Sequence, residues 1–185
     1  MLNTRIWKEY HIGDIFEMKA GFYSKKPNST SDGVKNIPFA SATKYNNGIS
    51  EWYSLDDIEE ARKSDDSPKN SPLRDKIFKG NCLIVANDGS VGETHYIDID
   101  FAGNAAITAL YIKGRDMNPY IGMFLCAVFE NEKYRFSYGR KWKLERMGKS
   151  TIWLPVSEDG SGEPDWQFME DYIKTRKYSN MLEGV

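Results

Sequence analysis

The sequence predicts a mixed α/β (α+β) fold formed by one domain, because short apolar runs of strand length alternate with segments of helical periodicity. The clearest strand is CLIVA at 82–86, a continuous apolar run bounded by turn residues. The clearest helix runs from Tyr120 to about Tyr134, where apolar side chains recur at helical spacing after an Asn-Pro start. At 185 residues the chain can bury a full hydrophobic core.

The first half of the chain predicts short elements between polar loops. SLDDIEEARK, within the acidic segment 51–66, indicates a short solvated helix with Ser54 as its N-cap. Asn47-Gly48 is typical of a tight turn. The other expected elements are a strand near 6–8, a helical turn over 12–16 in which Asp14 helps to cap, a turn-rich loop over 20–36, a strand at 37–40 and a polar loop over 64–72.

The second half predicts the larger elements. These are a hairpin with arms 82–86 and 94–97, a strand over 104–112, the helix 120–134, a strand over 150–156, a flexible link over 157–164 and a final helix from Asp165. The final helix places four apolar side chains on one face: Trp166, Met169, Tyr172 and Ile173. Either a partner surface or the chain's own domain covers this face, and both interpretations remain open.

Composition and cysteine usage exclude several classes of protein. The composition is 40% hydrophobic and 28% charged, with net charge −2, and no segment is long and apolar enough to span a membrane. The opening residues lack the apolar region of a signal peptide. Cys82 and Cys126 lie in apolar runs without a nearby histidine, so we expect reduced core thiols and no zinc site. Together these features predict a cytoplasmic protein.

One stretch concentrates positive charge. Residues 133–149 carry seven cations against the single carboxylate of Glu145, in a chain whose net charge is negative. Aromatic residues lie among the cations, and Gly139 is expected to allow a tight bend. Such a composition suits nucleic acid, because cations meet phosphates and planar groups meet bases or sugars. The alternative is a solvated basic helix whose aromatics face the core. The candidate DNA-binding residues here are Lys133, Arg135, Tyr138, Arg140, Lys141, Trp142 and Lys143.

Two further loops carry side chains that can read DNA. The SATKYNNGI run presents Lys44, Tyr45, Asn46 and Asn47 at the end of a strand. The NDGSVG turn presents Asn87, Asp88 and Ser90 and lacks the lysine and spacing of a phosphate-binding loop. The alternative for the first loop is an ordinary hairpin tip, and the NDGSVG turn is typical of a hairpin. Trp142, likewise, either contacts sugar-phosphate or packs in the core.

The order of these pieces resembles the target recognition domain of the specificity (S) subunits of Type I restriction-modification systems, BcgI-like specificity subunits included. The matching motifs are W-x4-IGDIF-x4-G from Trp7 to Gly21, IPFASATKYNNGI at 37–49, KGNCLIVANDGSVG at 79–92, SYGRKW at 137–142, LPV at 154–156 and PDWQFMEDYIK at 164–174. The resemblance implies a single head with a twisted mixed sheet and flanking helices, over residues 1–157. It also implies that residues 164–185 begin a spacer or dimerisation helix.

The resemblance further implies the function and the partners. It implies sequence-specific recognition of double-stranded DNA for bacterial defence, with modification (methyltransferase) and restriction subunits as partners. Neither a cofactor nor a metal is expected in this chain, because S-adenosylmethionine belongs to the methyltransferase subunit. Members of the family carry two heads, whereas this sequence has one head. It is therefore either a half-length protein that forms a homodimer through its final helix or a domain of a longer parent.

The sequence predicts no catalytic residues. His11 and His95 lie outside any nucleophile motif, and neither a nuclease nor a methyltransferase motif is present. Two other classes remain as alternatives. One is a metal-dependent enzyme acting on nucleic acid, with the acidic segment 51–66 as metal site, and the other is a protein-interaction module with a basic docking face.

Overall fold

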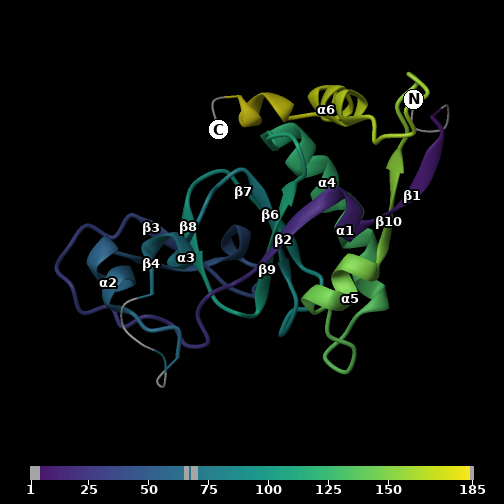
Figure 1. Cartoon of the computed structure of the whole chain (residues 1–185). Coiled ribbons are helices and arrows are strands. Elements are labelled where there is room, and N and C mark those ends of the chain that lie inside the picture. Colours follow the sequence, from purple (N-terminus) through teal and green to yellow (C-terminus); the bar gives the residue numbers. More distant parts are fainter. Residues whose placement is uncertain (1–4, 65–66, 68–70, 184–185) are drawn as a thin grey trace.

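The computed structural model describes residues 5–64, 67 and 71–183, and within them three sheets are flanked by helices (Figure 1). The strands are β1 (Trp7–His11), β2 (Phe16–Ala20), β3 (Ile37–Ala40), β4 (Ile49–Tyr53), β5 (Ile77–Phe78), β6 (Cys82–Ala86), β7 (Thr94–Ile97), β8 (Phe101–Gly103), β9 (Ile107–Ile112) and β10 (Thr151–Pro155). The helices are α1 (Ile12–Ile15), α2 (Leu55–Glu60), α3 (Leu73–Lys76), α4 (Pro119–Glu132), α5 (Leu144–Lys149) and α6 (Trp166–Lys174). Single 3-10 turns are η2 (Asn46–Gly48), η3 (Lys133–Arg135) and η4 (Ser179–Leu182).

The central sheet is antiparallel and has the order β2-β9-β6-β7. All five residues of β6 are buried, because apolar layers cover both faces of the sheet. Leu83 and Val85 face α4, while Cys82 and Ile84 face the second sheet. This arrangement explains why CLIVA is continuously apolar rather than alternating.

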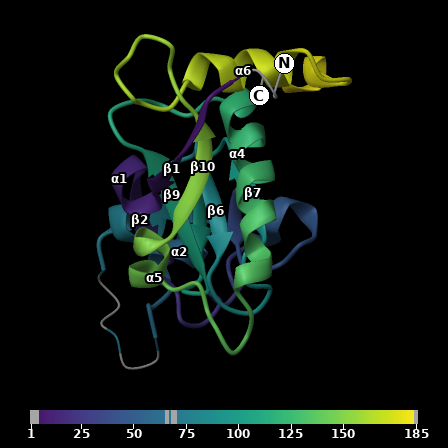
Figure 2. The same ribbon diagram turned by 90° about the vertical axis from the view of Figure 1, so that its right-hand side faces the viewer.

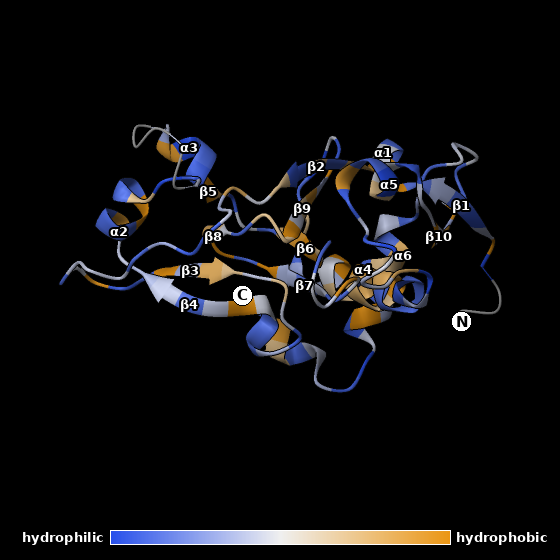
Figure 3. Cartoon of the chain, turned by 90° about the horizontal axis from the view of Figure 1, so that it is seen from below, coloured by the Kyte–Doolittle hydropathy of each residue, from blue (hydrophilic) through white to orange (hydrophobic). Residues whose placement is uncertain are grey.

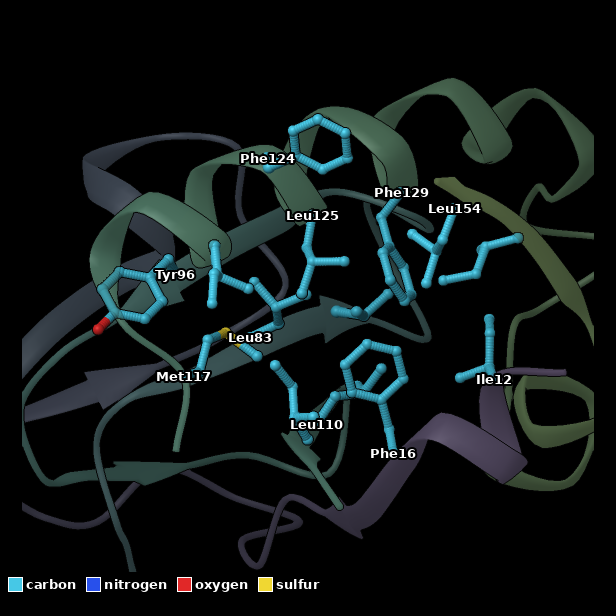
Figure 4. Packing of buried hydrophobic residues seen from close by; sticks show 14 of the residues in the cluster. Ile12, Phe16, Leu83, Tyr96, Leu110, Met117, Phe124, Leu125, Phe129 and Leu154 are labelled. Carbon is cyan, nitrogen blue, oxygen red and sulfur yellow. The ribbon is translucent and has the colours of Figure 1, made fainter. Parts of the chain in front are cut away.

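Helix α4 covers one face of the central sheet. Its side chains Phe124, Leu125 and Phe129 pack over Leu83 and Leu110 (Figure 4). The apolar residues seen from below follow β6, β9 and α4 (Figure 3). The Asn118 side chain caps the helix by accepting a hydrogen bond from the backbone N–H of Ile121 at 2.9 Å.

The second sheet, of order β4-β3-β8-β5, packs on the opposite face. It is mixed, since β3 and β8 are parallel. Ser54 and Asp57 form a capping box at the start of α2, which confirms the predicted N-cap. The predicted solvated acidic helix is wrong at Asp57, because this residue is buried. Its side chain accepts hydrogen bonds from the backbone N–H groups of Thr30 and Ser31.

A two-stranded ribbon of β1 and β10, with α1 and α5 at one end, completes the described part of the fold. The mixed α/β class is confirmed, and the described strands form three sheets, of which the sheet that contains β3 and β8 is the mixed one. The strands 37–40, 82–86 and 94–97 lie as predicted. Asp14 makes no side-chain cap of α1. Parts of the predicted acidic segment and polar loop, at 65–66 and 68–70, lie outside the described residues.

The final helix packs on its own domain. Met169 is completely buried, and the rings of Tyr172 and Phe124 meet edge to face at a centroid distance of 5.8 Å. Trp166 and Ile173 pack against the same core. Of the two interpretations that the sequence left open, this conformation favours the chain's own domain, because α4 covers the apolar face. The helix also ends earlier than predicted, at Lys174.

Candidate nucleic-acid interface

The fold brings the three predicted DNA-reading segments together at one end of the molecule. These segments are the loop 41–48 between β3 and β4, the turn 87–93 between β6 and β7, and residues 133–143 after α4. His95 Nε2 lies 2.9 Å from the carbonyl oxygen of Thr43, which ties the first loop to β7. The second segment contacts the third at Gly92, where an added Cβ would lie only 2.5 Å from Lys133 Cβ. The left-handed φ of +88° at Gly92 also favours glycine at this position.

This end of the molecule lies far from α6. Helix α4 connects the two, since Asn118 at its start donates a hydrogen bond to Glu170 of α6 and η3 follows its last residue. Its 14 residues span about 21 Å at 1.5 Å per residue. In Figure 2 the loop after α4 lies at the lower end of the view and α6 at the upper end.

Residues 137–140 form a tight hairpin that projects below α5 (Figure 1). The backbone N–H of Arg140 donates to the Ser137 oxygen at 2.9 Å, and the reverse bond is 3.3 Å. Tyr138 is 78% exposed at the tip. Gly139 has open space around its Cβ position and no left-handed φ, so the turn does not require glycine there, contrary to the sequence prediction.

Buried aromatics anchor the two arms of the hairpin. The Trp142 and Phe136 rings stack at 4.2 Å between centroids, and Trp142 also packs against Phe129. The indole Nε1 donates a hydrogen bond of 3.1 Å to Ser150 Oγ. Since Trp142 is completely buried, it cannot touch DNA in this conformation. The prediction of a DNA contact is therefore corrected to the alternative, a packing role.

Carboxylates accompany most of the cations in this segment. Lys133 pairs with Glu93 at 3.1 Å and with Glu130, and Arg135 pairs with Glu132 at 2.6 Å. Lys141 and Lys143 both pair with Asp88, as described below. Within the described part of the chain, Arg140 alone of these five cations has no carboxylate partner, and it is exposed. Its guanidinium lies 5.8 Å from the centroid of the Phe136 ring.

The loop 41–48 exposes Lys44, Tyr45 and Asn46. Tyr45 is 66% exposed, and the Lys44 ammonium lies 5.1 Å from its ring centroid. Asn46 and Asn47 both have left-handed backbones, with φ of 49° and 51°. The Asn47 side chain donates a hydrogen bond of 2.7 Å to the backbone carbonyl oxygen of Tyr96. Asn47 therefore holds the loop against β7, which leaves Lys44, Tyr45 and Asn46 to face a ligand.

The polar residues of the turn 87–93 differ in exposure: Asn87 is buried, whereas Asp88 and Ser90 lie at the surface. Asn87 is buried, donates to Thr108 Oγ1 at 3.1 Å and accepts from Lys143 at 2.9 Å. It therefore does not face the groove as predicted, because its polar atoms are committed to protein partners. Ser90 is exposed and Asp88 is partly exposed.

The pairing of Asp88 has a measurable consequence for acid stability. Its hydrogen bond with Lys141, supported by Gly89 N–H and Lys143, lowers the pKa of the Asp88 carboxyl from 3.8 to about 2. A carboxylate whose pKa is lowered by folding stabilises the fold above its unfolded pKa, and this contribution disappears as the pH falls through the folded value. We expect the parent to have the higher Tm at pH 7 and to lose that lead over Asp88→Asn between about pH 4 and pH 2. Parallel pH profiles in thermal circular dichroism would contradict this.

The counter-ions of the interface were not predicted from the sequence. Glu130 and Glu132 precede Lys133 and Arg135 by three residues, a helical spacing that favours ion pairs. Glu93 and Asp88 reach their lysines only through the fold, and local spacing gives no signal for them. Tyr134, which is 83% exposed, was also not selected as a candidate.

No group of three or more His, Cys, Asp or Glu side chains gathers as a metal site among the described residues. In the same part of the chain, no helix is both long and apolar enough to cross a membrane. Cys82 and Cys126 are free thiols, and burial raises the pKa of each to about 12.

Comparisons with known proteins identify the family of the chain and solved structures with a similar fold. Residues 5–183 match the family model of the Type I restriction modification DNA specificity domain. S.BcgI, the specificity subunit of a Type II restriction enzyme from Heyndrickxia coagulans, is 29% identical over 167 residues, which are 90% of this chain and 42% of that protein.

Two solved structures share the fold. The S subunit of a Type I restriction-modification system from M. genitalium gives a TM-score of 0.56 at 15% identity, over 98% of this chain and 40% of that one. The HsdS subunit from Thermoanaerobacter tengcongensis gives 0.53 at 11% identity, over 96% and 37%. The chain thus spans about two fifths of the length of these relatives.

Proposed function

The chain belongs to the family of Type I restriction modification DNA specificity domains, and we propose that it recognises a double-stranded DNA site through the interface formed by its three gathered loops. The observation that supports this most is the meeting of the basic hairpin 137–141 with the loops 41–48 and 87–93 at one end of the fold. Exposed cations there can hold phosphates, while Arg140 and Asn46 can reach base edges.

We propose that the chain selects the DNA site and that partner subunits carry the catalytic activities. S.BcgI is named as the specificity subunit of a restriction enzyme. A third solved structure with this fold, 14% identical with a TM-score of 0.55, describes complex assembly and conformational transition of a Type I restriction-modification system. By analogy, modification and restriction subunits are the partners of this chain. S-adenosylmethionine would then bind to the modification subunit.

A homodimer that reads a symmetric split site remains a proposal. Its interface needs a surface other than the buried side of α6, because Met169 of that side is completely covered by the chain itself. Light scattering at micromolar concentration tests this, and a monomer counts against it.

Fluorescence anisotropy on labelled random duplex DNA, over a series of salt concentrations, tests the proposed function. We expect log-linear weakening of binding with log salt, with a slope near −0.9 per phosphate contact. A site can then be selected from a random pool. If the folded chain fails to bind any duplex at low salt, both alone and with its modification subunit, DNA recognition is wrong and a protein-docking role for the basic face takes its place.

A further inference from the structure

The Asp88 carboxylate lies between two of the lysines that this interface offers to DNA. Its Oδ2 atom is 2.7 Å from Lys141 Nζ and 3.3 Å from Lys143 Nζ. Its Oδ1 atom accepts the backbone N–H of Gly89 at 2.9 Å. These three partners occupy most of the roughly four acceptor sites of the carboxylate.

The surrounding structure fixes this carboxylate in place. The backbone N–H groups of Asn87 and Asp88 donate to the Ala106 oxygen at 2.8 and 3.3 Å. The buried Asn87 side chain bonds to Thr108 and also accepts a hydrogen bond from Lys143. The turn is therefore tied to the start of β9, which holds the backbone of Asp88 beside the two lysines.

A fixed carboxylate competes with DNA phosphate for the same ammonium groups. Lys141 and Lys143 are 35% and 51% exposed, so that phosphate can reach both of them. A phosphate that contacts either one must displace Asp88 or lie beside it, and like charges at such short range repel. The lowered pKa of the Asp88 carboxyl keeps it charged throughout the neutral range.

We propose that Asp88 is a specificity-determining positioning residue, an internal counter-ion that limits sequence-independent binding of the DNA backbone to Lys141 and Lys143. This inference rests on the proposed function. Backbone contacts supply essentially all of non-specific binding, so that a restraint on two lysines acts chiefly on that component. Arg140, which has no such carboxylate among the described residues, is not restrained in this way.

Asp88→Asn tests this role, because asparagine keeps the size and an acceptor oxygen but removes the charge. On random duplex we expect a salt slope steeper by about 1, corresponding to one further phosphate contact, and roughly 15- to 20-fold tighter binding at 50 mM salt that converges with the parent near 1 M. Asp88→Ala makes the same change of charge and serves as the second variant if Asp88→Asn does not fold. Thermal unfolding establishes that each variant is folded before it is titrated.

Asp171→Asn is the matched control. It removes the same charge from α6, where the carboxylate accepts a hydrogen bond from Gln167 at 2.9 Å. The length of α4 separates α6 from the interface, and that distance exceeds the Debye length of about 10 Å at 0.1 M salt. The control should therefore match the parent on random duplex.

The possible outcomes separate the inference from the function on which it rests. If the parent binds duplex and folded Asp88→Asn gives the same slope and affinity, the counter-ion role is wrong. If Asp88→Asn weakens binding only to the selected site, Asp88 reads a base instead, and the inference is again overturned. If neither the parent nor any variant binds duplex, with or without the modification subunit, the proposed function itself fails.

Discussion

Replacing Trp142 by alanine is expected to lower the free energy of unfolding by about 3–5 kcal/mol, the range for truncating a large buried aromatic side chain. The indole is completely buried, stacks on Phe136 and packs against Phe129. The variant also leaves Ser150 Oγ without the donor that now meets it at 3.1 Å. For a chain of this length the melting temperature should fall by roughly 6–20 °C. Chemical denaturation followed by circular dichroism measures the change directly.

Trp153→Ala is the matched control for this prediction. Trp153 lies on β10, eleven residues after Trp142 in the sequence, but 51% of it is exposed. Its truncation should cost no more than about 1 kcal/mol. Equal losses for the two variants would contradict the assignment of Trp142 to the core. A stable Trp142→Ala that has lost only DNA binding would restore the direct contact predicted from the sequence.

The sequence predicted those elements whose signals are local. CLIVA became β6 with the expected bounds, and Asn118 and Ser54 cap the helices that their positions indicated. Strand β2 was missed because FEMKA contains good helix formers and most of its residues are exposed. Its pairing with β9, which lies far along the chain, overrides local propensity. β8 was missed for a related reason, since FAG is too short to carry a periodic signal.

The segments that form the site were predictable from the sequence, but the roles of their individual side chains were not. Composition selected the hairpin around Arg140 and the two turns, and the fold places all three at one end. Which side chain faces solvent depends on tertiary partners that sequence spacing does not reveal. Asn87 and Asn47 look like readers of DNA, yet their amides bond to the strands beneath them. Asp88 looks like a third reader, yet two lysines occupy its carboxylate.

Arg140→Ala is expected to weaken binding to the selected DNA site by about 1–3 kcal/mol, or roughly 5- to 150-fold in Kd. Arg140 follows the exposed hairpin tip and has no carboxylate partner in the described part of the chain, so that its planar fork is available for two acceptors. The two acceptors of a guanine edge suit this fork. The loss should therefore be smaller on random duplex, and reselection from a random pool should show relaxed preference at one base pair.

Two further variants distinguish a base contact from a phosphate contact at Arg140. Arg140→Lys keeps the charge but loses the fork, so that it should retain the affinity for random duplex and lose the base preference. Arg176→Ala, at the distant end of α6, removes an exposed arginine and should change neither. A uniform loss on all sequences for Arg140→Ala, with a salt slope shallower by about 1 and rescue by lysine, would instead make Arg140 a phosphate clamp. Base reading would then have to come from the loop 41–48, where Lys44, Tyr45 and Asn46 are exposed.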